Sequence, residues 1–280
     1  MTTTKRAACV IGWPVEHSRS PLIHNYWLKL YGIDGEYRRE LVPREEFRSF
    51  IASLAARGYV GANVTVPHKE AAFALSEPDE RARAVGAVNT LWLDGGTLRS
   101  TNTDVEGFLD NLDACAPDWD RDLYKAVVLG AGGAARAVVY GLITRGYERI
   151  VVVNRTRSRA EALRERFGKQ VHPADWGHDI VLDGAGLLVN ATMLGMERQP
   201  ELTVDLGYLP SHAVVADLVY VPLVTPLIRS AKARGLRTAD GLGMLLHQAV
   251  RGFALWFGKT PTITAELRAL VEADLGTSAG

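Results

Sequence analysis

The sequence has little cysteine, no excess of charge of either sign and no long apolar run. Its two cysteines, Cys9 and Cys115, lack the spacing of a metal site and allow at most one disulfide, so we expect reduced thiols in a cytoplasmic protein. Lys plus Arg and Asp plus Glu number 32 each, which favours neither nucleic acid nor an anionic membrane as a partner. No stretch approaches roughly 18 uninterrupted apolar residues, and the N-terminus lacks a signal-peptide core. We therefore expect a soluble protein without a metal site.

The chain is long enough, at 280 residues with 47% hydrophobic content, to form two domains. Residues 6–100 alternate between strand and helix patterns. We expect strands over 7–11, 36–42 and 61–66, helices over 21–30, 44–57, 69–75 and 79–85, and a hairpin of 90–93 with 97–99. Ser20 is a candidate N-cap, with Pro21 at the first helical position. A further helix starts beside Thr103 and runs to about residue 114.

A glycine-rich segment follows the apolar run at residues 126–129. Residues 130–134 read Gly-Ala-Gly-Gly-Ala, a helical pattern follows directly, and a second apolar strand occupies residues 149–153. This order is the context of a dinucleotide-binding G-x-G-x-x-A motif. Gly130 permits the tight turn, Gly132 lets backbone N–H groups approach a pyrophosphate, and Ala134 allows close helix–strand packing. Glycine turns also simply connect βα units, but the second strand arrives at the expected distance, so we predict a dinucleotide site.

The residues after the second strand distinguish NAD from NADP. An NAD site usually has Asp or Glu about 20 residues past the glycines, whereas this segment reads Asn154-Arg-Thr-Arg-Ser-Arg159. Three arginines with an amide and hydroxyls suit a 2′-phosphate, which a guanidinium can hold with two hydrogen bonds. Alternatively, Thr156 is the N-cap of a helix that begins near Arg157, and the arginines are solvated. Both interpretations can hold together, and we predict NADP.

Polar side chains gather at the predicted strand ends of the first region, where ligands of open α/β sheets bind. They lie in residues 12–21, 63–69, 89 and 102–104. Singly, each has a structural interpretation: Ser20 and Thr103 as N-caps, Asn89 as a turn residue, Lys69 as a surface ammonium. Together they supply hydroxyl, amide, ammonium and carboxylate groups with almost no metal ligands, which is what a small polyhydroxy acid needs.

Nine motifs occur together along nearly the whole chain. They are Gly12-x-Pro-x-x-His-Ser-x-Ser-Pro21, Asn63-Val-Thr-Val-Pro-His-Lys69, Gly86-Ala-Val-Asn-Thr90, Asn102-Thr-Asp104, Gly130-Ala-Gly-Gly-Ala134, Asn154-Arg-Thr-x-x-Arg159, Asn190-Ala-Thr192, Asp217-x-x-Tyr220 and Gly241-Leu-Gly-Met244 with Gln248. In this order they resemble the motifs of the shikimate dehydrogenase family. Met193 departs from the pattern, since many members carry serine there, and this bears on contacts near the nicotinamide.

The resemblance implies an α/β fold of two domains. Residues 1–106 plus 243–280 would form a substrate-binding and catalytic domain, and residues 107–242 a Rossmann-like, doubly wound NADP-binding domain. The implied reaction is the reversible NADPH-dependent reduction of 3-dehydroshikimate to shikimate, in aromatic amino-acid biosynthesis. The implied partner is therefore a small molecule, with no nucleic acid and no membrane, and the chain would be a monomer or homodimer.

The resemblance also implies a role for each site residue. The catalytic pair would be Lys69 and Asp104. The implied substrate ligands are Ser18, Ser20 and Tyr220 for the carboxylate, and Asn63, Thr65, Asn89 and Gln248 for the ring hydroxyls and reacting oxygen. The implied cofactor contacts are Gly130, Ala131, Gly132, Gly133 and Ala134 at the pyrophosphate, Asn154, Arg155, Thr156 and Arg159 at the 2′-phosphate, and Leu218 and Gly241 beside the nicotinamide. Arg157 lies between matching positions and is expected to be solvated.

The catalytic pair suits this chemistry. Reduction of a ketone develops negative charge on oxygen, which the Lys69 ammonium can stabilise and protonate. The Asp104 carboxylate favours the charged lysine. Two alternatives stay open: a quinate/shikimate dehydrogenase of broader specificity, often NAD-linked, and a non-catalytic module that binds metabolite and dinucleotide. The two serines and the arginine-rich loop argue against the first, and the retained Lys69 and Asp104 against the second.

Overall fold

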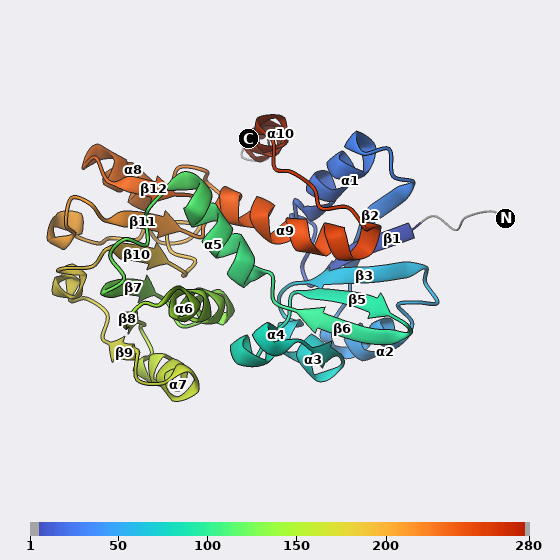
Figure 1. Ribbon diagram of the computed structural model, residues 1–280, viewed down its shortest axis with the longest axis horizontal. Coiled ribbons are helices and arrows are strands. Elements are labelled where there is room, and N and C mark those ends of the chain that lie inside the picture. Colours follow the sequence, from blue (N-terminus) through green and yellow to red (C-terminus); the bar gives the residue numbers. More distant parts are fainter. Residues whose placement is uncertain (1–5, 278–280) are drawn as a thin grey trace. The chain divides into compact units, whose positions relative to one another are not determined.

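Two six-stranded sheets organise residues 6–277, the part of the chain that the computed structural model describes. Each sheet belongs to one of two compact units, Met1–Thr103 with Gln248–Gly280 (unit 1) and Asp104–His247 (unit 2). The predicted α/β class with two domains is confirmed (Figure 1). The domain limits at 106/107 and 242/243 stay a prediction beside this division.

Unit 1 contains a mixed sheet in the order β2-β1-β3-β5-β6-β4. Pairing is parallel for β1 with β2 and β3 and for β4 with β6, and antiparallel for β5 with β3 and β6. The strands are β1 (Arg6–Gly12), β2 (Gly35–Leu41), β3 (Tyr59–Val64), β4 (Glu77–Pro78), β5 (Thr90–Asp94) and β6 (Thr97–Thr101). The helices are α1 (Ser20–Leu30), η1 (Arg44–Glu46), α2 (Phe47–Ala52), α3 (Lys69–Ala74), α4 (Glu80–Val85) and α10 (Ala265–Thr277).

Two sequence predictions for unit 1 are wrong in detail. Ser20 is the first residue of α1 and not its N-cap, which is Arg19. The reason is local, since the Ile23 N–H donates to the Arg19 carbonyl at 3.2 Å, which starts the helix one residue earlier than predicted. The helix expected over 44–57 is shorter: a 3₁₀ turn leads into α2, which ends at Ala52. The Ser53 hydroxyl donates to the Ser49 and Phe50 carbonyls, an alternative to continued helix.

Unit 2 contains an all-parallel sheet in the order β12-β11-β10-β7-β8-β9. This is the doubly wound arrangement, and its strand order reverses between β7 and β10, where such folds bind ligands. The strands are β7 (Lys125–Leu129), β8 (Arg149–Val153), β9 (Val171–Ala174), β10 (Leu187–Asn190), β11 (Val214–Asp217) and β12 (Arg237–Ala239). The helices are α5 (Asp104–Cys115), α6 (Gly133–Arg145), α7 (Arg157–Phe167), η2 (Asp179–Leu182), η3 (Leu206–Tyr208) and α8 (Pro226–Ala233).

Both faces of the unit 2 sheet are buried, which explains why its strands read as continuous apolar runs. Val128 and Val152 belong to the core on one face, and Val127 and Val151 to the core on the other. One further helix, α9 (Gly241–Phe257), supplies residues to both units. Within residues 6–277 no helix is long and apolar enough to cross a membrane.

Candidate active site

The two predicted carboxylate ligands are Ser18, on the loop between β1 and α1, and Ser20, the first residue of α1. Ser18 N–H donates to the Val15 carbonyl at 3.0 Å, and Arg39 donates to the Ser18 carbonyl from Nε at 3.1 Å and Nη2 at 2.7 Å. Ser20 is buried and Ser18 half-buried. Two neighbouring hydroxyls can hold a carboxylate without burying a second formal charge.

A buried hydrogen-bond network joins three predicted substrate ligands in unit 1. Asn63 Nδ2 donates to the Asn89 carbonyl and to Thr90 Oγ1, both at 3.1 Å. Asn89 Oδ1 accepts from the Thr103 N–H at 2.8 Å and from the hydroxyls of Thr103 and Thr90 at 3.2 and 3.1 Å. The Thr103 hydroxyl lies 3.5 Å from Gln248 Oε1. The network thus brings Asn63, Asn89 and Gln248 together.

Thr90 and Thr103 are the links of this network and were not predicted as site residues. Both are fully buried, and their hydroxyls lie 3.1 Å apart. Thr103 had only been expected as a helix cap. The signal was present, because both threonines stand next to asparagines inside the quoted motifs.

Lys69 is the first residue of α3, and its backbone is held from both sides. Its carbonyl accepts from the Val88 N–H at 3.2 Å. The preceding His68 is buried, donates from Nε2 to the Val42 carbonyl at 2.7 Å and stacks on Phe47 at 4.3 Å. Burial lowers the pKa of His68 and so favours the neutral ring, whose bond to Val42 anchors the turn before Lys69.

The remaining predicted members of the substrate site are spread along the chain. Thr65 is half-buried and its N–H donates to the Ile11 carbonyl at 2.9 Å, which holds it at the end of β1. Asp104 follows Thr103 directly and is the first residue of α5, so it belongs to unit 2 while Lys69 belongs to unit 1. Within residues 6–277 no group of three or more His, Cys, Asp or Glu residues could hold a metal ion.

The glycine turn of unit 2 has the geometry that a dinucleotide needs. Gly130 has φ +104°, and a Cβ there would lie 3.0 Å from the Ala191 carbonyl oxygen. Gly132 is the N-cap of α6 and Gly133 its first residue; a Cβ on either would meet nothing within 4 Å. A pyrophosphate can use that open space and the unpaired N–H groups at the helix start. Ala131 is buried and Ala134 half-buried beneath this surface.

The three arginines of the predicted 2′-phosphate loop differ in whether they form ion pairs. Arg157 is ion-paired with Glu161 at 3.0 Å and with Asp175 at 2.8 Å, so it is exposed but engaged. Arg155 and Arg159 are exposed, and neither has an ion pair within the described part of the chain. Thr156 is the N-cap of α7, but its side chain makes no capping bond there among residues 6–277. Asn154 Nδ2 donates to the Thr156 carbonyl at 2.8 Å and holds the loop in shape.

The segment after β11 is fixed by a buried carboxylate. Asp217 accepts from Asn190 Nδ2 at 2.9 Å, the Val219 N–H at 3.1 Å and the Thr225 hydroxyl at 2.6 Å. Burial nevertheless raises the pKa of Asp217, because desolvation outweighs these three donors. The network fixes the turn that carries Leu218 and the half-buried Tyr220.

The predicted nicotinamide contacts lie beside this turn. A Cβ on Gly241 would collide with the Leu218 carbonyl, so the structure brings these two positions together. Met193, the departure from the family pattern, is 63% exposed on the loop after β10. A thioether there is available for contact with a ligand on the strand ends.

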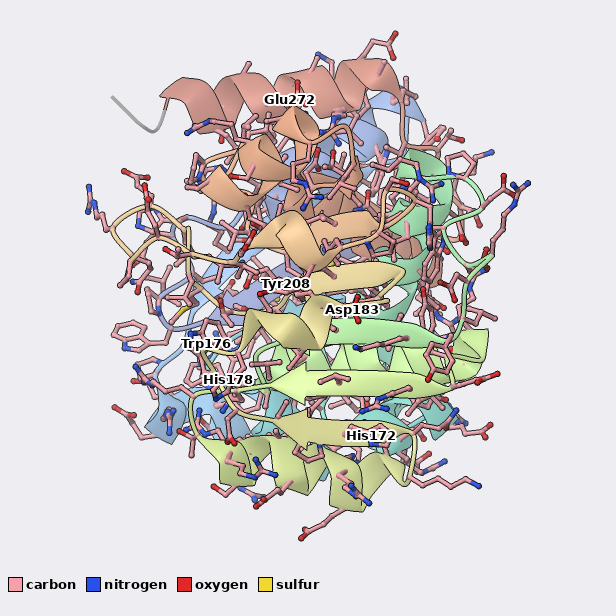
Figure 2. All side chains as sticks on the ribbon, turned by 90° about the vertical axis from the view of Figure 1, so that its left-hand side faces the viewer. His172, Trp176, His178, Asp183, Tyr208 and Glu272 are labelled. Carbon is pink, nitrogen blue, oxygen red and sulfur yellow. The ribbon has the colours of Figure 1, made fainter. Side chains whose placement is uncertain are left out.

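A cavity of about 100 Å³ lies at the ends of β7 and β8, where Leu129 and Val153 line it. Trp176 and His178, on the loop after β9, form another part of the wall (Figure 2). Ligand pockets for drug-sized molecules are about 300–1,000 Å³, so a whole dinucleotide has to extend along the open strand ends. The glycine turn, the free arginines and the Leu218–Gly241 contact fit such a ligand.

Comparison with known proteins identifies the family of the chain. The family model for the shikimate dehydrogenase substrate binding domain matches residues 10–91, the model for shikimate/quinate 5-dehydrogenase matches residues 118–193, and the model for the shikimate 5′-dehydrogenase C-terminal domain matches residues 241–269. Among curated proteins, the shikimate dehydrogenase (NADP(+)) of Rhodopseudomonas palustris strain TIE-1 is 67% identical over 277 residues, 98% of this chain and 99% of the relative. The protein of the same name from Nitrobacter hamburgensis is 66% identical, covering 98% of this chain and 96% of the relative.

Solved structures extend the same result. Shikimate 5-dehydrogenase from Thermus thermophilus, in complex with NADP(H) and shikimate, superposes with a TM-score of 0.83 at 37% identity, covering 97% of this chain and 99% of that one. Quinate dehydrogenase from Corynebacterium glutamicum, in complex with NAD, gives 0.88 at 32% identity, covering 96% and 99%. The resemblance predicted from the motifs is confirmed, and the chain belongs to the shikimate dehydrogenase family.

Proposed function

We propose that this chain is an NADP-dependent shikimate dehydrogenase, which interconverts 3-dehydroshikimate and shikimate. The observation that carries the proposal is the buried network of Asn63, Asn89 and Gln248, in the same unit as Ser18 and Ser20. Its neutral donors and acceptors suit a ligand with several hydroxyls and one carboxylate. Relatives named shikimate dehydrogenase (NADP(+)), at 67% and 66% identity, support the same activity.

Substrate recognition would divide between the two ends of the ligand. Ser18 and Ser20 would donate to the carboxylate, with the Tyr220 hydroxyl as a third group. The remaining polar side chains of the site would bind the ring hydroxyls and the reacting oxygen of the substrate. They are Asn63, Thr65, Asn89 and Gln248. Because these groups are uncharged, they can be buried at moderate cost only while each is hydrogen-bonded.

Lys69 would perform the proton chemistry. Its ammonium stabilises the negative charge that develops on the reacting oxygen and donates its proton there, and in the opposite direction the neutral amine accepts that proton. Asp104 would keep the ammonium charged and oriented. NADPH, when bound, supplies the hydride, and NADP⁺ accepts it in the reverse reaction.

The cofactor would be held mainly by backbone and exposed side chains of unit 2. The N–H groups of Gly132 and Gly133 would bind the pyrophosphate, with Gly130, Ala131 and Ala134 shaping the turn. Arg155 and Arg159, helped by Asn154 and Thr156, would bind the 2′-phosphate. Leu218 and Gly241 would contact the nicotinamide end.

The near-ultraviolet absorbance of NADPH tests this proposal in one assay. Shikimate and quinate are each offered with NADP⁺ and with NAD⁺, and we expect the fastest turnover with shikimate and NADP⁺. Equal rates with quinate would favour the quinate/shikimate alternative, which the Corynebacterium glutamicum neighbour makes worth testing. No turnover with any pair would favour a module that only binds these ligands.

Two finer expectations belong to the same proposal. We expect a monomer or homodimer, which light scattering on the purified protein would distinguish. We also expect a cytoplasmic location, which cell fractionation would check.

A further inference from the structure

Tyr37 is a buried residue of β2 that no motif contains. Its backbone is clamped by Asn25, whose Nδ2 donates to the Tyr37 carbonyl at 2.9 Å and whose Oδ1 accepts from the Tyr37 N–H at 3.0 Å. Its ring stacks on His24 at 4.2 Å between centroids, and Trp256 lies 5.7 Å away. Backbone and ring are therefore both fixed, and the hydroxyl has one direction in which to point.

The Tyr37 hydroxyl donates to Asn63 Oδ1 at 2.6 Å. Because Asn63 Nδ2 already donates to the Asn89 carbonyl and to Thr90, the orientation of this amide is determined. Both of its N–H groups are used, so only Oδ1 is left to meet a ligand. Asn63 can consequently serve a substrate only as an acceptor, from a ring hydroxyl.

The same phenol is linked to the carboxylate end of the site. Burial raises the pKa of Tyr37 well above its usual range, while hydrogen bonds to Ser20 and Asn63 act in the opposite direction. A neutral phenol has one hydrogen, and here Asn63 accepts it, so Ser20 must be the donor in its bond to Tyr37. A rotation of the Ser20 hydroxyl can redirect that hydrogen to a carboxylate.

Arg39, two residues further along β2, holds the other serine. Its guanidinium donates twice to the Ser18 carbonyl, at 3.1 and 2.7 Å. The Ser18 hydroxyl accepts from the Ser20 N–H at 3.3 Å, which leaves its own hydrogen for another acceptor. Tyr37 and Arg39 together thus determine where both serine hydroxyls and the Asn63 oxygen lie.

We propose that Tyr37 and Arg39 are positioning residues, which set Ser18, Ser20 and Asn63 for shikimate without touching it. This inference rests on the proposed function and extends it to residues outside the family motifs. Their substitution should weaken recognition of shikimate and leave the cofactor and the chemical step nearly unchanged.

Steady-state kinetics of Tyr37→Phe and Arg39→Ala test the inference. Tyr37→Phe keeps the ring and removes the hydroxyl that donates to Asn63 Oδ1. We therefore expect KM for shikimate to rise about 10-fold or more. Arg39 is exposed, and we expect Arg39→Ala to raise the same KM about 3-fold. For both variants kcat and KM for NADP⁺ should stay within about 2-fold, and calorimetry should show matching losses in shikimate affinity.

Neighbouring residues offer matched controls. The Tyr59 hydroxyl donates to Glu40, and Arg38 pairs with Glu36. Along β2, Arg38 and Glu40 alternate with Tyr37 and Arg39 and so point to the other face of the sheet. Tyr59→Phe and Arg38→Ala should leave KM for shikimate unchanged.

The outcomes separate this inference from the proposed function. Wild-type KM in both test variants, in an enzyme that turns over shikimate, would overturn the inference alone, and so would equal KM shifts in the control variants. A wild-type protein that neither binds nor oxidises shikimate would overturn the proposed function and the inference with it. Should Tyr37→Phe fail to fold, Arg39→Ala decides the question, because its side chain is exposed.

Discussion

The predicted sites of the two units differ in the kind of groups that would bind the ligand. In unit 1 the predicted ligands are buried side chains that hold one another, such as Asn63 and Asn89. In unit 2 the predicted cofactor contacts are backbone at Gly132 and Gly133 and exposed guanidinium groups at Arg155 and Arg159. A site of interlocked side chains is sensitive to residues that never touch the ligand. A site of backbone and surface charge depends mainly on the residues that do.

The buried ionisable groups of the two units also differ. The substrate network of unit 1 borders on His24, a fully buried ring whose pKa is lowered to about 3 by desolvation. Unit 2 instead buries the carboxylate of Asp217, whose pKa is raised by desolvation. Burial thus favours the neutral form in both cases, but the two groups respond to acid in opposite directions.

The largest expected effect is at Lys69. Lys69→Met keeps the length of the side chain and removes the ammonium, so we expect kcat to fall by about 10²–10⁴ while shikimate still binds. Turnover and calorimetry of the same preparation measure both quantities. Lys29→Met, at an exposed position in the last turn of α1, is the control and should retain full activity. A folded Lys69→Met protein with near-normal turnover would falsify the assigned chemistry.

Substitution of the three arginines in the 2′-phosphate loop should affect NADP⁺ binding differently, because among the residues that the structure describes Arg157 is ion-paired and Arg155 and Arg159 are not. Arg155→Ala and Arg159→Ala should each raise KM for NADP⁺ by roughly 10–100-fold, because each removes a charged hydrogen bond of about 1.5–3 kcal/mol to the 2′-phosphate. KM for NAD⁺ should hardly change. Arg157→Ala, which loses two ion pairs with Glu161 and Asp175, should affect KM for NADP⁺ much less. An equal effect of all three substitutions would contradict the distinction.

Substitutions of two glycines in the glycine turn of unit 2 should have different effects, one on cofactor binding and the other on stability. A side chain at Gly132 enters open space, so Gly132→Val should leave the melting temperature near that of the wild type and weaken NADP⁺ binding severely. Gly130→Ala places a Cβ at φ +104° against Ala191 and should cost about 1–3 kcal/mol of stability. Thermal melting with and without NADP⁺ distinguishes the two effects, and identical behaviour of the two variants would count against this account of the turn.

The smallest effects concern pH. The folded pKa of His24 is depressed from 6.5 to about 3, so its contribution to stability is present above pH 6.5 and is lost as pH falls toward 3. The limiting slope for one proton is about 1.4 kcal/mol per pH unit. For Asp217 the folded pKa is raised, so its contribution is present below pH 3.8 and is lost as pH rises through the folded pKa.

Variants isolate these two contributions. When the pH is lowered from 6 to 4, the melting temperature of His24→Phe should fall less than that of the wild type. When the pH is raised from 4 to 6, the melting temperature of Asp217→Asn should increase relative to that of the wild type. Melting curves across that range provide the measurement. Parallel curves for the wild type and both variants would show that neither group titrates as its burial requires.

Much of the fold could be predicted because its signals are local. The glycine turn stands between an apolar strand and a helical pattern, which predicts the order strand, turn, helix; the helix α6 begins at Gly133, inside the glycine segment and not after it. The short helix α2 was predicted too long, because the bonds of Ser53 to Ser49 and Phe50 depend on geometry that a periodic pattern does not contain. Two-residue β4 carries too little sequence to show a pattern.

The contact of Tyr37 with Asn63 escaped prediction because strand pairing creates it. Tyr37 and Asn63 lie on β2 and β3, which both flank β1, with Tyr37 opposite Ala8 and Asn63 opposite Val10. No spacing along the chain indicates that their side chains meet. The roles of the motif residues, Lys69 and Asp104 above all, stay predictions that the proposed variants would test.

The contact of Trp256 with β3 and β5 has a consequence for the order in which the protein can be made. Trp256 donates from Nε1 to the Leu91 carbonyl at 2.8 Å, and Gly61 leaves the indole its place because a Cβ there would collide with it. The sheet of unit 1 therefore needs a partner, Trp256, that is synthesised after the whole of unit 2, as is Gln248. Unit 2, whose residues 104–247 are continuous, can fold while translation proceeds. Synthesis of unit 1 thus starts before that of unit 2, and unit 1 is completed after it.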